Sequence, residues 1–339
     1  MPTKQHPAKI LIIGPAWVGD MVMAQSLFIA LKQQSPDCLI DVLAPDWSMP
    51  LLERMPEVNQ AIAMPLGHGK FGLKIRINLA RQLAAQGYRQ AFVLPNSWKS
   101  ALIPFFAGIA IRTGFIGEGR LGLLNDIRKL EKTRLPMTVQ RFVALAANQS
   151  DPPQFSYPRL QVDSHAQAEA VEKFALNRLT KILALCAGAE FGPAKRWPVE
   201  HFAEVARQKH QQGWQVWLFG SEKDRAITEQ IDFASGGICT NLAGRTSLGE
   251  AIDLLALASV VVSNDSGLMH VAAALDRKLI ALYGSSDPGF TPPLHRHAGI
   301  LSLQLDCAPC FQRQCPLGHT RCLTEILPER VLAAINAAQ

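Results

Sequence analysis

Short apolar runs alternate with amphipathic stretches along most of the chain. In the first half, apolar runs predict buried strands and stretches with apolar positions at helical spacing predict helices. The strands are expected at Ile10–Ile13, Leu39–Leu43, Ala61–Met64, Ala91–Leu94 and Ile111–Ile116, and the helices at Asp20–Gln33, Met49–Arg54, Leu73–Gln86, Ser97–Phe106 and Met137–Ala147. Residues 117–135 show no clear pattern.

The alternation stops at the segment NQSDPPQFSYPRL, residues 148–160, and then resumes. Its three prolines and its polarity are typical of a linker between domains. The later strands are expected at Lys181–Cys186, Gln215–Phe219, Val260–Ser263 and Leu279–Tyr283, and the helices at His201–Gln211, Asp224–Phe233, Ala251–Ala258, Met269–Leu275 and Glu329–Ala338.

Two sets of continuous apolar strands separated by helices predict an α/β protein with two Rossmann-like parallel-sheet domains. We expect an N-terminal domain over residues 1–155 and a C-terminal domain over 156–326. A closing helix in 327–339 could pack back on the first domain. Ligands of such sheets bind beyond the carboxyl ends of the strands, often in a cleft between domains. Polar residues at those strand ends are therefore the candidates for a site.

Length and composition limit the class of protein. A chain of 339 residues exceeds what one core usually supports, and 48% hydrophobic with 18% charged residues indicates a globular protein. No apolar run is long enough to span a bilayer, and the start of the chain lacks a cleavage site, so we expect a cytoplasmic protein. The net charge of +6 is scattered, which argues against nucleic-acid binding. It fits an anionic substrate or membrane surface, or simply a solvated surface.

The stretch GPAWVGDMVMAQSL follows the first strand. The spacing of Gly14 and Gly19 matches neither the dinucleotide-binding fingerprint nor a P-loop. Asp20 lies where the next helix begins. Its local sequence favours a helix cap, and the alternative is a general base at the edge of the sheet.

Two later strand ends carry charged residues. After the strand ending at Cys186, the loop AGAEFGPAKRWP brings Lys195 and Arg196 just before a helix. Two cations there oppose the helix dipole unless an anion lies between them. In LFGSEKD, Glu222 follows a strand and could accept hydrogen bonds from ribose hydroxyls, or merely favour the start of the next helix.

The stretch VVSNDSGLMHVAAAL passes from a strand into a helix through Asp265, Ser266 and Gly267, and His270 follows in the first turn. These residues could be an ordinary helix cap. They could also form a phosphate site, because helix N-termini attract anions. The turn YGSSDP, with Gly and Ser after another strand, is a further Gly/Ser-rich strand end in this half.

Four cysteines lie within sixteen residues near the end of the chain. They are Cys307, Cys310, Cys315 and Cys322. The compartment makes a disulfide unfavourable, so free thiols are the default interpretation and a structural zinc site is the alternative. In either case we expect the segment to shape a loop, and we expect no cofactor and no metal in catalysis.

Together these motifs resemble the ADP-heptose:lipopolysaccharide heptosyltransferases, a family with the GT-B architecture of two Rossmann domains. The resemblance covers nearly the whole chain. It is carried by ILIIGPAWVGDMVMAQSL, DVLAPDW, MPEVNQAIAMPLGHG, VLPNSWKSALIPFFAGI, GLLNDIR, GAEFGPAKRWP, LFGSEKD and NDSGLMHVAAAL. The first, fourth and sixth of these are most similar to the members that add the second heptose of the inner core. The cysteine cluster is the one feature that we do not associate with the best-known members.

The resemblance implies inverting transfer of L-glycero-D-manno-heptose from ADP-heptose to the first heptose of the lipopolysaccharide inner core. Asp20 would be the catalytic base. Lys195, Ser266, Gly267 and His270 would bind the donor diphosphate. Glu222 would bind the ribose and Asp265 the sugar hydroxyls. The partners would be ADP-heptose and the lipid A–inner-core acceptor at the cytoplasmic face of the inner membrane.

The acceptor pocket is the least defined part of this hypothesis. We expect the first domain to build it with Lys99, Arg112, Arg120 and Arg128, although a solvated surface would account for them equally well. Another inner-core heptosyltransferase is the nearest alternative function. A sugar-nucleotide epimerase of the same architecture and a non-catalytic nucleotide-binding module are alternatives of other classes.

Overall fold

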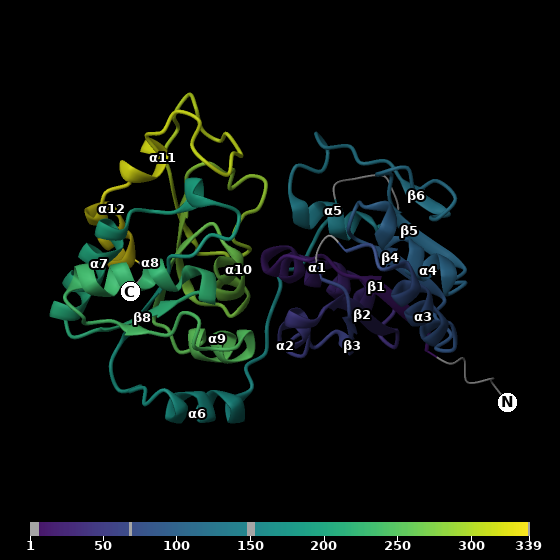
Figure 1. Cartoon of the computed structure of the whole chain (residues 1–339), viewed down its shortest axis with the longest axis horizontal. Coiled ribbons are helices and arrows are strands. Elements are labelled where there is room, and N and C mark those ends of the chain that lie inside the picture. The colour runs from purple at the N-terminus through teal and green to yellow at the C-terminus, as the bar shows by residue number, and fades with distance from the viewer. Residues whose placement is uncertain (1–6, 68–69, 148–152, 338–339) are drawn as a thin grey trace. The chain divides into compact units, whose positions relative to one another are not determined.

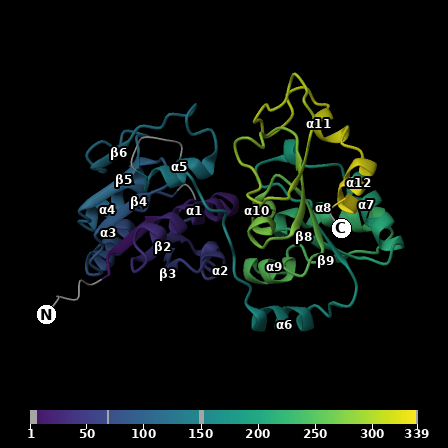
Figure 2. The ribbon, with the colours of Figure 1, turned by 180° about the vertical axis from the view of Figure 1, so that it is seen from behind.

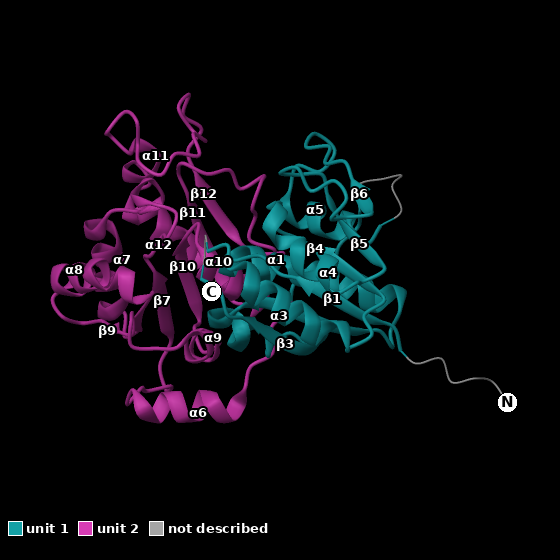
Figure 3. Cartoon of the chain, turned by 45° about the vertical axis from the view of Figure 1, so that its right-hand side comes forward, with its two compact units in different colours: residues 1–158 teal, residues 159–339 magenta. Residues whose placement is uncertain are grey.

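The structure is a computed structural model that describes residues 7–67, 70–147 and 153–337. The chain forms two compact units, residues 1–158 and 159–339 (Figure 3). The boundary expected from the sequence lies three residues earlier. Of the linker expected at 148–160, residues 148–152 lie outside the described residues, as do residues 1–6 of the N-terminal segment.

Unit 1 is built on a six-stranded sheet in the order β3-β2-β1-β4-β5-β6, in which every neighbouring pair is parallel. Its strands are β1 (Lys9–Ile13), β2 (Leu39–Pro45), β3 (Val58–Met64), β4 (Gln90–Val93), β5 (Ile111–Phe115) and β6 (Asp126–Arg128). Its helices are α1 (Val18–Gln34), α2 (Met49–Leu52), α3 (Leu73–Ala84), α4 (Leu102–Phe106) and α5 (Thr138–Ala144), with 3₁₀ turns η1 (Asp46–Ser48) and η2 (Trp98–Ser100).

Unit 2 repeats this topology with the order β12-β11-β10-β7-β8-β9, again parallel throughout. Its strands are β7 (Ile182–Cys186), β8 (Gln215–Phe219), β9 (Thr240–Asn241), β10 (Val260–Asn264), β11 (Lys278–Tyr283) and β12 (Gly299–Ser302). Its helices are α6 (Ser164–Lys173), α7 (Val199–Gln211), α8 (Arg225–Ser235), α9 (Leu248–Leu255), α10 (Gly267–Ala274), α11 (Arg321–Thr324) and α12 (Pro328–Ala337), with 3₁₀ turns η3 (Pro193–Lys195) and η4 (Glu222–Asp224).

The central strands are buried along their whole length, as in β7 and β10, because helices cover both faces of each sheet (Figure 1). This explains why their sequences are continuous apolar runs instead of alternating ones. In each sheet the strand order reverses once, between β1 and β4 in unit 1 and between β7 and β10 in unit 2. Ligands of doubly wound sheets bind at the carboxyl ends of the strands beside this switch point.

The sequence predicted most of the long elements, and it missed helix α6 and several short elements. Predicted strands and helices match β1, β7, β10, α1, α3 and α7 within a few residues. The missed elements include α6, β6, β9, β12 and α11. Helix α6 buries little more than Ala170, so its sequence has almost no apolar periodicity, and it begins where the carboxylate of Asp163 accepts two backbone N–H groups. The missed strands lie at or near sheet edges and are only two to four residues long.

The closing helix α12 belongs to the core of unit 2, whereas the sequence suggested that it could pack on the first domain. Its buried face of Val331, Leu332 and Ile335 joins the cluster formed by β7, β8, β10 and α7. Figures 1 and 2 both show α12 beside α7. Among the described residues, no helix combines the length and the apolar character that crossing a bilayer requires.

We predict that Ile335→Ala lowers the free energy of unfolding of unit 2 by about 2–4 kcal/mol, because the side chain is fully buried and its removal leaves a cavity. Hydrogen exchange of β7 and β10 measures the change. Leu327→Ala, just before the same helix at a side chain that is 54% exposed, should change stability by less than about 0.5 kcal/mol. Equal effects of the two substitutions would contradict the packing of α12.

Candidate active site

The two strands beside the switch point of unit 2 are joined by one asparagine. The side-chain amide of Asn264, at the end of β10, donates to the carbonyl of Ala187 at 2.7 Å, and its oxygen accepts the backbone N–H of Trp197 at 3.1 Å. Trp197 is itself buried, and its indole donates to the carbonyl of Ile326. These bonds fix the loop that leaves β7 against the end of β10.

That loop places Lys195 next to Asp265. The ammonium of Lys195 lies 2.5 Å from the Asp265 carboxylate, and the side chains are 16% and 5% exposed. The ammonium also lies over the ring of Phe191, 5.0 Å from its centre. A largely buried carboxylate needs a charged partner, so each group fixes the position of the other. The structure therefore unites two residues that are seventy positions apart in the sequence.

Helix α10 begins directly after Asp265, with Ser266 as its N-cap residue. The side chain of Ser266 does not accept a backbone N–H, and its hydroxyl lies 3.2 Å from that of Ser263 instead. Ser266 and Gly267 are partly exposed. The N-cap serine thus leaves the first N–H groups of α10 to other partners, and the dipole of the helix favours an anion there.

His270 lies one turn into α10 and is buried. Burial lowers the pKa of its imidazole to about 4; the nearby charge of Asp265 raises this pKa and that of Lys195 lowers it. The imidazole is therefore neutral near pH 7 and carries one N–H donor. It can donate to a phosphate oxygen without taking up a proton.

Several buried polar atoms in the loops of unit 2 have no hydrogen-bond partner within the described part of the chain. They include the hydroxyls of Ser285 and Ser286, which follow β11, and Nε of Arg196, beside Lys195. Buried polar groups are normally paired, so such atoms indicate a missing partner such as a ligand or a water. Burial raises the pKa of Tyr283, and the charges of Asp265 and Asp287 raise it further. The backbone N–H of Asp265 donates to the carbonyl of Leu282 at 3.1 Å, so the end of β11, from which this turn leaves, lies beside Asp265.

The sequence marked Gly284, Ser285 and Ser286 as one more Gly/Ser-rich strand end but assigned them no role. Neighbouring parallel strands place their carboxyl ends together, so the pairing of β10 with β11 accounts for this proximity. The pairing itself could not be predicted from either segment alone.

Glu222 follows β8 in the turn η4, and its side chain is 69% exposed. Gly244 makes room for the Glu222 side chain, because a Cβ at Gly244 would clash with the Glu222 carboxylate. The backbone φ of Gly244 is +69°, a conformation that also favours glycine. Asp224, which the sequence analysis passed over as part of a helix, is buried and accepts hydrogen bonds from the N–H and hydroxyl of Ser221. It holds the turn that presents Glu222.

The segment with the cysteine cluster packs on the Lys195 loop. The carbonyl of Arg313 accepts the N–H of Ala194 at 3.1 Å, and the Arg313 guanidinium lies 5.3 Å from the ring centre of Phe191. A Cβ at Gly192 would clash with the Arg313 carbonyl. Arg313 lies between Cys310 and Cys315, so this segment shapes the loop that carries Lys195.

The four cysteines are free thiols in the structure. Burial raises the pKa of Cys322, and the charges of Cys310, Cys307 and Cys315 raise it further, so each of these three lies near Cys322. Within the described ranges, no group of three or more His, Cys, Asp or Glu side chains is arranged to hold a metal ion. Structural zinc at this cluster stays a prediction from the sequence.

In unit 1, Asp20 lies in the first turn of α1, at the carboxyl end of β1 and beside the switch point. Trp17 occupies the N-cap position, so Asp20 is not the cap that its local sequence favoured. An acidic residue in the first turn still complements the helix dipole. Asp20 is partly exposed, as a residue that meets a substrate must be.

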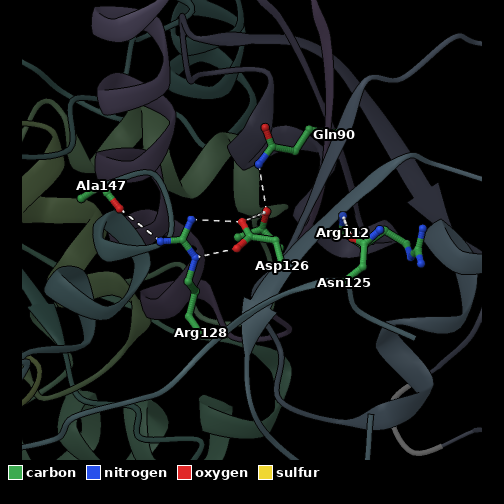
Figure 4. A network of polar contacts seen from close by, with 7 residues as sticks. Gln90, Arg112, Asn125, Asp126, Arg128 and Ala147 are labelled. Carbon is green, nitrogen blue, oxygen red and sulfur yellow. Dashed lines mark hydrogen bonds and ion pairs between the residues drawn. The ribbon is translucent and has the colours of Figure 1, made fainter. Parts of the chain in front are cut away.

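Three of the four expected acceptor residues have structural contacts within unit 1. Arg120 is only 1% exposed and donates to the carbonyls of Pro95 and Phe115, so the structure assigns it a structural role in place of the expected acceptor contact. Arg128 forms a bidentate pair with Asp126, at 2.9 and 3.0 Å (Figure 4). The guanidinium of Arg112 donates to the carbonyls of Ile109 and Leu123.

The fourth expected acceptor residue is Lys99, whose role stays a prediction. It lies in η2, which follows β4, and β4 pairs with β1 at the switch point of unit 1. The segments carrying Asp20 and Lys99 therefore leave the carboxyl ends of adjacent strands. Lys99 is partly exposed.

Two Rossmann-type sheets of this topology have the GT-B architecture, in which ligands bind at the carboxyl ends of the strands. The sequence pattern of glycosyltransferase family 9 (heptosyltransferase) matches residues 76–321. The chain belongs to this family, and it is an enzyme.

Individual relatives match nearly the whole chain. It is 48% identical over 340 residues to lipopolysaccharide heptosyltransferase 2 of Escherichia coli K12, covering 97% of this chain and 98% of that protein. It is 49% identical to lipooligosaccharide heptosyltransferase 2 of Haemophilus influenzae, covering 96% and 98%. The solved structure of E. coli ADP-heptose lps heptosyltransferase II superimposes with a TM-score of 0.88, at 46% identity, and covers 97% of this chain and 98% of that one. The sequence-based assignment of fold and family is confirmed.

We predict that His270 titrates with a pKa near 4, which NMR of the imidazole measures. Because this pKa lies below the 6.5 of an unfolded chain, protonation favours unfolding as the pH falls from 6.5 toward 4. The decrease in the free energy of unfolding should reach roughly 3 kcal/mol at low pH, and it should be absent above about pH 7. His270→Gln should lack this component of the pH dependence. A pKa near 6.5 would contradict the burial of this side chain.

Proposed function

We propose that this protein transfers L-glycero-D-manno-heptose from ADP-heptose to the first heptose of the lipopolysaccharide inner core, with inversion at the anomeric carbon. The observation that carries the proposal is the 48% identity, over nearly the full length of both chains, to a lipopolysaccharide heptosyltransferase 2. The polar groups gathered at the switch point of unit 2 support it, because they suit a nucleotide diphosphate.

Loss of ADP requires charge to be stabilised on the diphosphate as the bond to the sugar breaks. Lys195 and the N–H groups at Ser266 and Gly267 would supply this stabilisation, and neutral His270 would donate one further hydrogen bond. Groups already held in place act most strongly on charge that develops in the transition state. Lys195 is held by Asp265 and Phe191, so little reorganisation is needed.

Residues at other strand ends of unit 2 would make the remaining contacts with ADP-heptose. Glu222, exposed after β8, would accept hydrogen bonds from the ribose hydroxyls. Asp265 would bind hydroxyls of the heptose while it keeps Lys195 in place. Asp265 lies between the Lys195 loop and the start of α10, which suits a residue that contacts the sugar next to the diphosphate.

The acceptor reacts in one displacement. Its hydroxyl oxygen forms a bond to the anomeric carbon from the face opposite ADP, the bond from that carbon to the phosphate oxygen breaks, and ADP leaves with the electron pair. Asp20 would take the hydroxyl proton. Lys195 and the α10 N-terminus offset the negative charge of the leaving group, and the mechanism requires no metal ion.

The acceptor carries lipid A, so the proposal includes peripheral contact with the cytoplasmic face of the inner membrane. Another inner-core transfer step is the alternative, since the steps differ only in the acceptor. A sugar-nucleotide epimerase is not favoured, because the chain belongs to a glycosyltransferase family.

The test is incubation of purified protein with ADP-heptose and acceptors that carry zero, one or two heptoses. We expect product only from the one-heptose acceptor, measured by mass spectrometry. Product from the zero-heptose acceptor would instead assign the first transfer step. No product with any acceptor, under conditions in which the E. coli relative is active, would refute the proposal.

We predict that Asp20→Asn lowers kcat by about 10²–10⁴-fold, because the acceptor proton then has no base. Its affinity for ADP should stay within about twofold of the unmodified protein. Asp37→Asn, at an exposed carboxylate of the same unit, should leave both quantities unchanged. Unchanged turnover of the Asp20 variant would remove this residue from the mechanism.

We predict that Ser285→Ala with Ser286→Ala weakens binding of ADP-heptose by at least about 100-fold, because two hydrogen bonds are lost, without lowering the thermal stability of the free protein. The two hydroxyls are buried without partners in the free protein, so their loss costs the fold little, while each lost hydrogen bond to a charged ligand costs about 1.5–3 kcal/mol. Calorimetry measures both quantities. Ser235→Ala is the control, because its buried hydroxyl already bonds the carbonyl of Asp232. It should lower stability and leave binding unchanged.

A further inference from the structure

Unit 1 exposes a group of large apolar side chains that its own fold does not cover. They come from the segment just before and into α3, from η2 and from α4, and α3 packs against α4 (Figure 1). Each is between 39% and 43% exposed: Phe71, Leu73, Ile75, Trp98, Phe105 and Phe106. Single exposed apolar residues are ordinary, but a group of six on adjoining elements marks an interaction surface.

Arg76 links the two segments that carry Phe71 and Trp98. Its guanidinium is buried and donates to the carbonyl of Phe71 at 2.7 Å and to that of Lys99 at 3.1 Å. It thereby joins the start of α3 to η2. The rings of Phe71 and Trp98 lie 5.2 Å apart as a result. The apolar surface is therefore a fixed feature of the fold.

In the segment that carries these side chains, residues 58–117, every charged residue is positively charged. Residues 58–117 contain seven Lys and Arg and no Asp or Glu, whereas 28 acidic residues in 339 would place roughly five in a segment of this length. Lys70 and Lys74 are exposed and alternate with Phe71, Leu73 and Ile75 along the chain. We call the six apolar side chains together with Lys70 and Lys74 the aromatic–basic surface.

The chemistry of the aromatic–basic surface selects one kind of partner. Aromatic and aliphatic side chains enter the boundary between headgroups and acyl chains, and lysines beside them attract anionic headgroups. A second copy of the same surface would bring like charges together. Nucleic acid would satisfy the lysines but would leave Leu73 and Ile75 without apolar partners.

We propose that the aromatic–basic surface docks unit 1 on an anionic phospholipid bilayer. The inference rests on the proposed function only in that a lipid-linked acceptor requires such docking. The surface begins beside Lys99, the expected acceptor residue, so docking there places the acceptor side of the enzyme at the membrane.

The test measures co-sedimentation of the full chain with vesicles of phosphatidylethanolamine, with and without 30% phosphatidylglycerol. We expect binding that requires the anionic lipid and weakens with salt. Lys70→Glu with Lys74→Glu should lower the partition coefficient at least about tenfold. Phe71→Ser with Ile75→Ser should lower it at both low and high salt, because it removes apolar contacts.

The control variants carry the same kinds of substitution at exposed positions outside the aromatic–basic surface. Lys129→Glu with Lys132→Glu changes the net charge equally at exposed positions of unit 1, and Phe233→Ser removes a ring that is 88% exposed on unit 2. Both should bind vesicles like the unmodified protein. If the charge control lost vesicle binding equally, net charge alone would explain the result and the proposal would be overturned. Full vesicle binding by both surface variants would also overturn it. Thermal melting checks that every variant is folded.

Turnover separates this proposal from the proposed function. The surface variants should transfer heptose normally to a deacylated, water-soluble acceptor and poorly to an acceptor embedded in vesicles. Equal loss on both acceptors would make the surface part of the acceptor pocket and overturn docking. Vesicle binding that depends on the surface, without transfer to any acceptor, would refute the proposed function and leave the docking surface standing.

Discussion

The ion pair between Lys195 and Asp265 organises the candidate site of unit 2. A carboxylate that is almost fully buried would be strongly destabilising alone, and an ammonium beside a helix N-terminus would be repelled by the dipole. In the pair, the two charges compensate each other. The N-terminus of α10 then leaves this edge of the sheet positively polarised. The pair also fixes the position of the Lys195 ammonium, which is the group proposed to meet the diphosphate.

Other contacts of unit 2 hold the Lys195–Asp265 ion pair in position. Asn264 joins the Lys195 loop to the end of β10, and Gly192 lets the loop approach the carbonyl of Arg313. The guanidinium of Arg313, in the cysteine-containing segment, lies over Phe191. The segment at residues 307–322 therefore shapes the loop that carries Lys195. Burial of His270 completes the arrangement, because it keeps the imidazole neutral beside a cation.

The two units repeat one topology with different chemistry. Both have their polar groups at the carboxyl ends of the strands beside the reversal of strand order, where Rossmann-type sheets leave room for a ligand. Unit 2 offers donors suited to phosphate. Unit 1 offers a carboxylate, Asp20, and an acid-free segment whose exposed rings and lysines suit a lipid surface. The proposed transfer from ADP-heptose to a lipid-linked acceptor would use both edges.

The sequence by itself determined most of the longer elements, the two-unit division and the family, because continuous apolar strands, amphipathic helices and long motifs are local properties. It also singled out Asp20, Lys195, Glu222 and Asp265, since each follows a strand that could be recognised. Tertiary structure decided what those residues touch. The pairing of Lys195 with Asp265, the role of Asp224, the unpartnered hydroxyls of Ser285 and Ser286 and the burial of Arg120 all depend on which strands and loops become neighbours. Strand order is set by packing over the whole sheet, so no single segment encodes it.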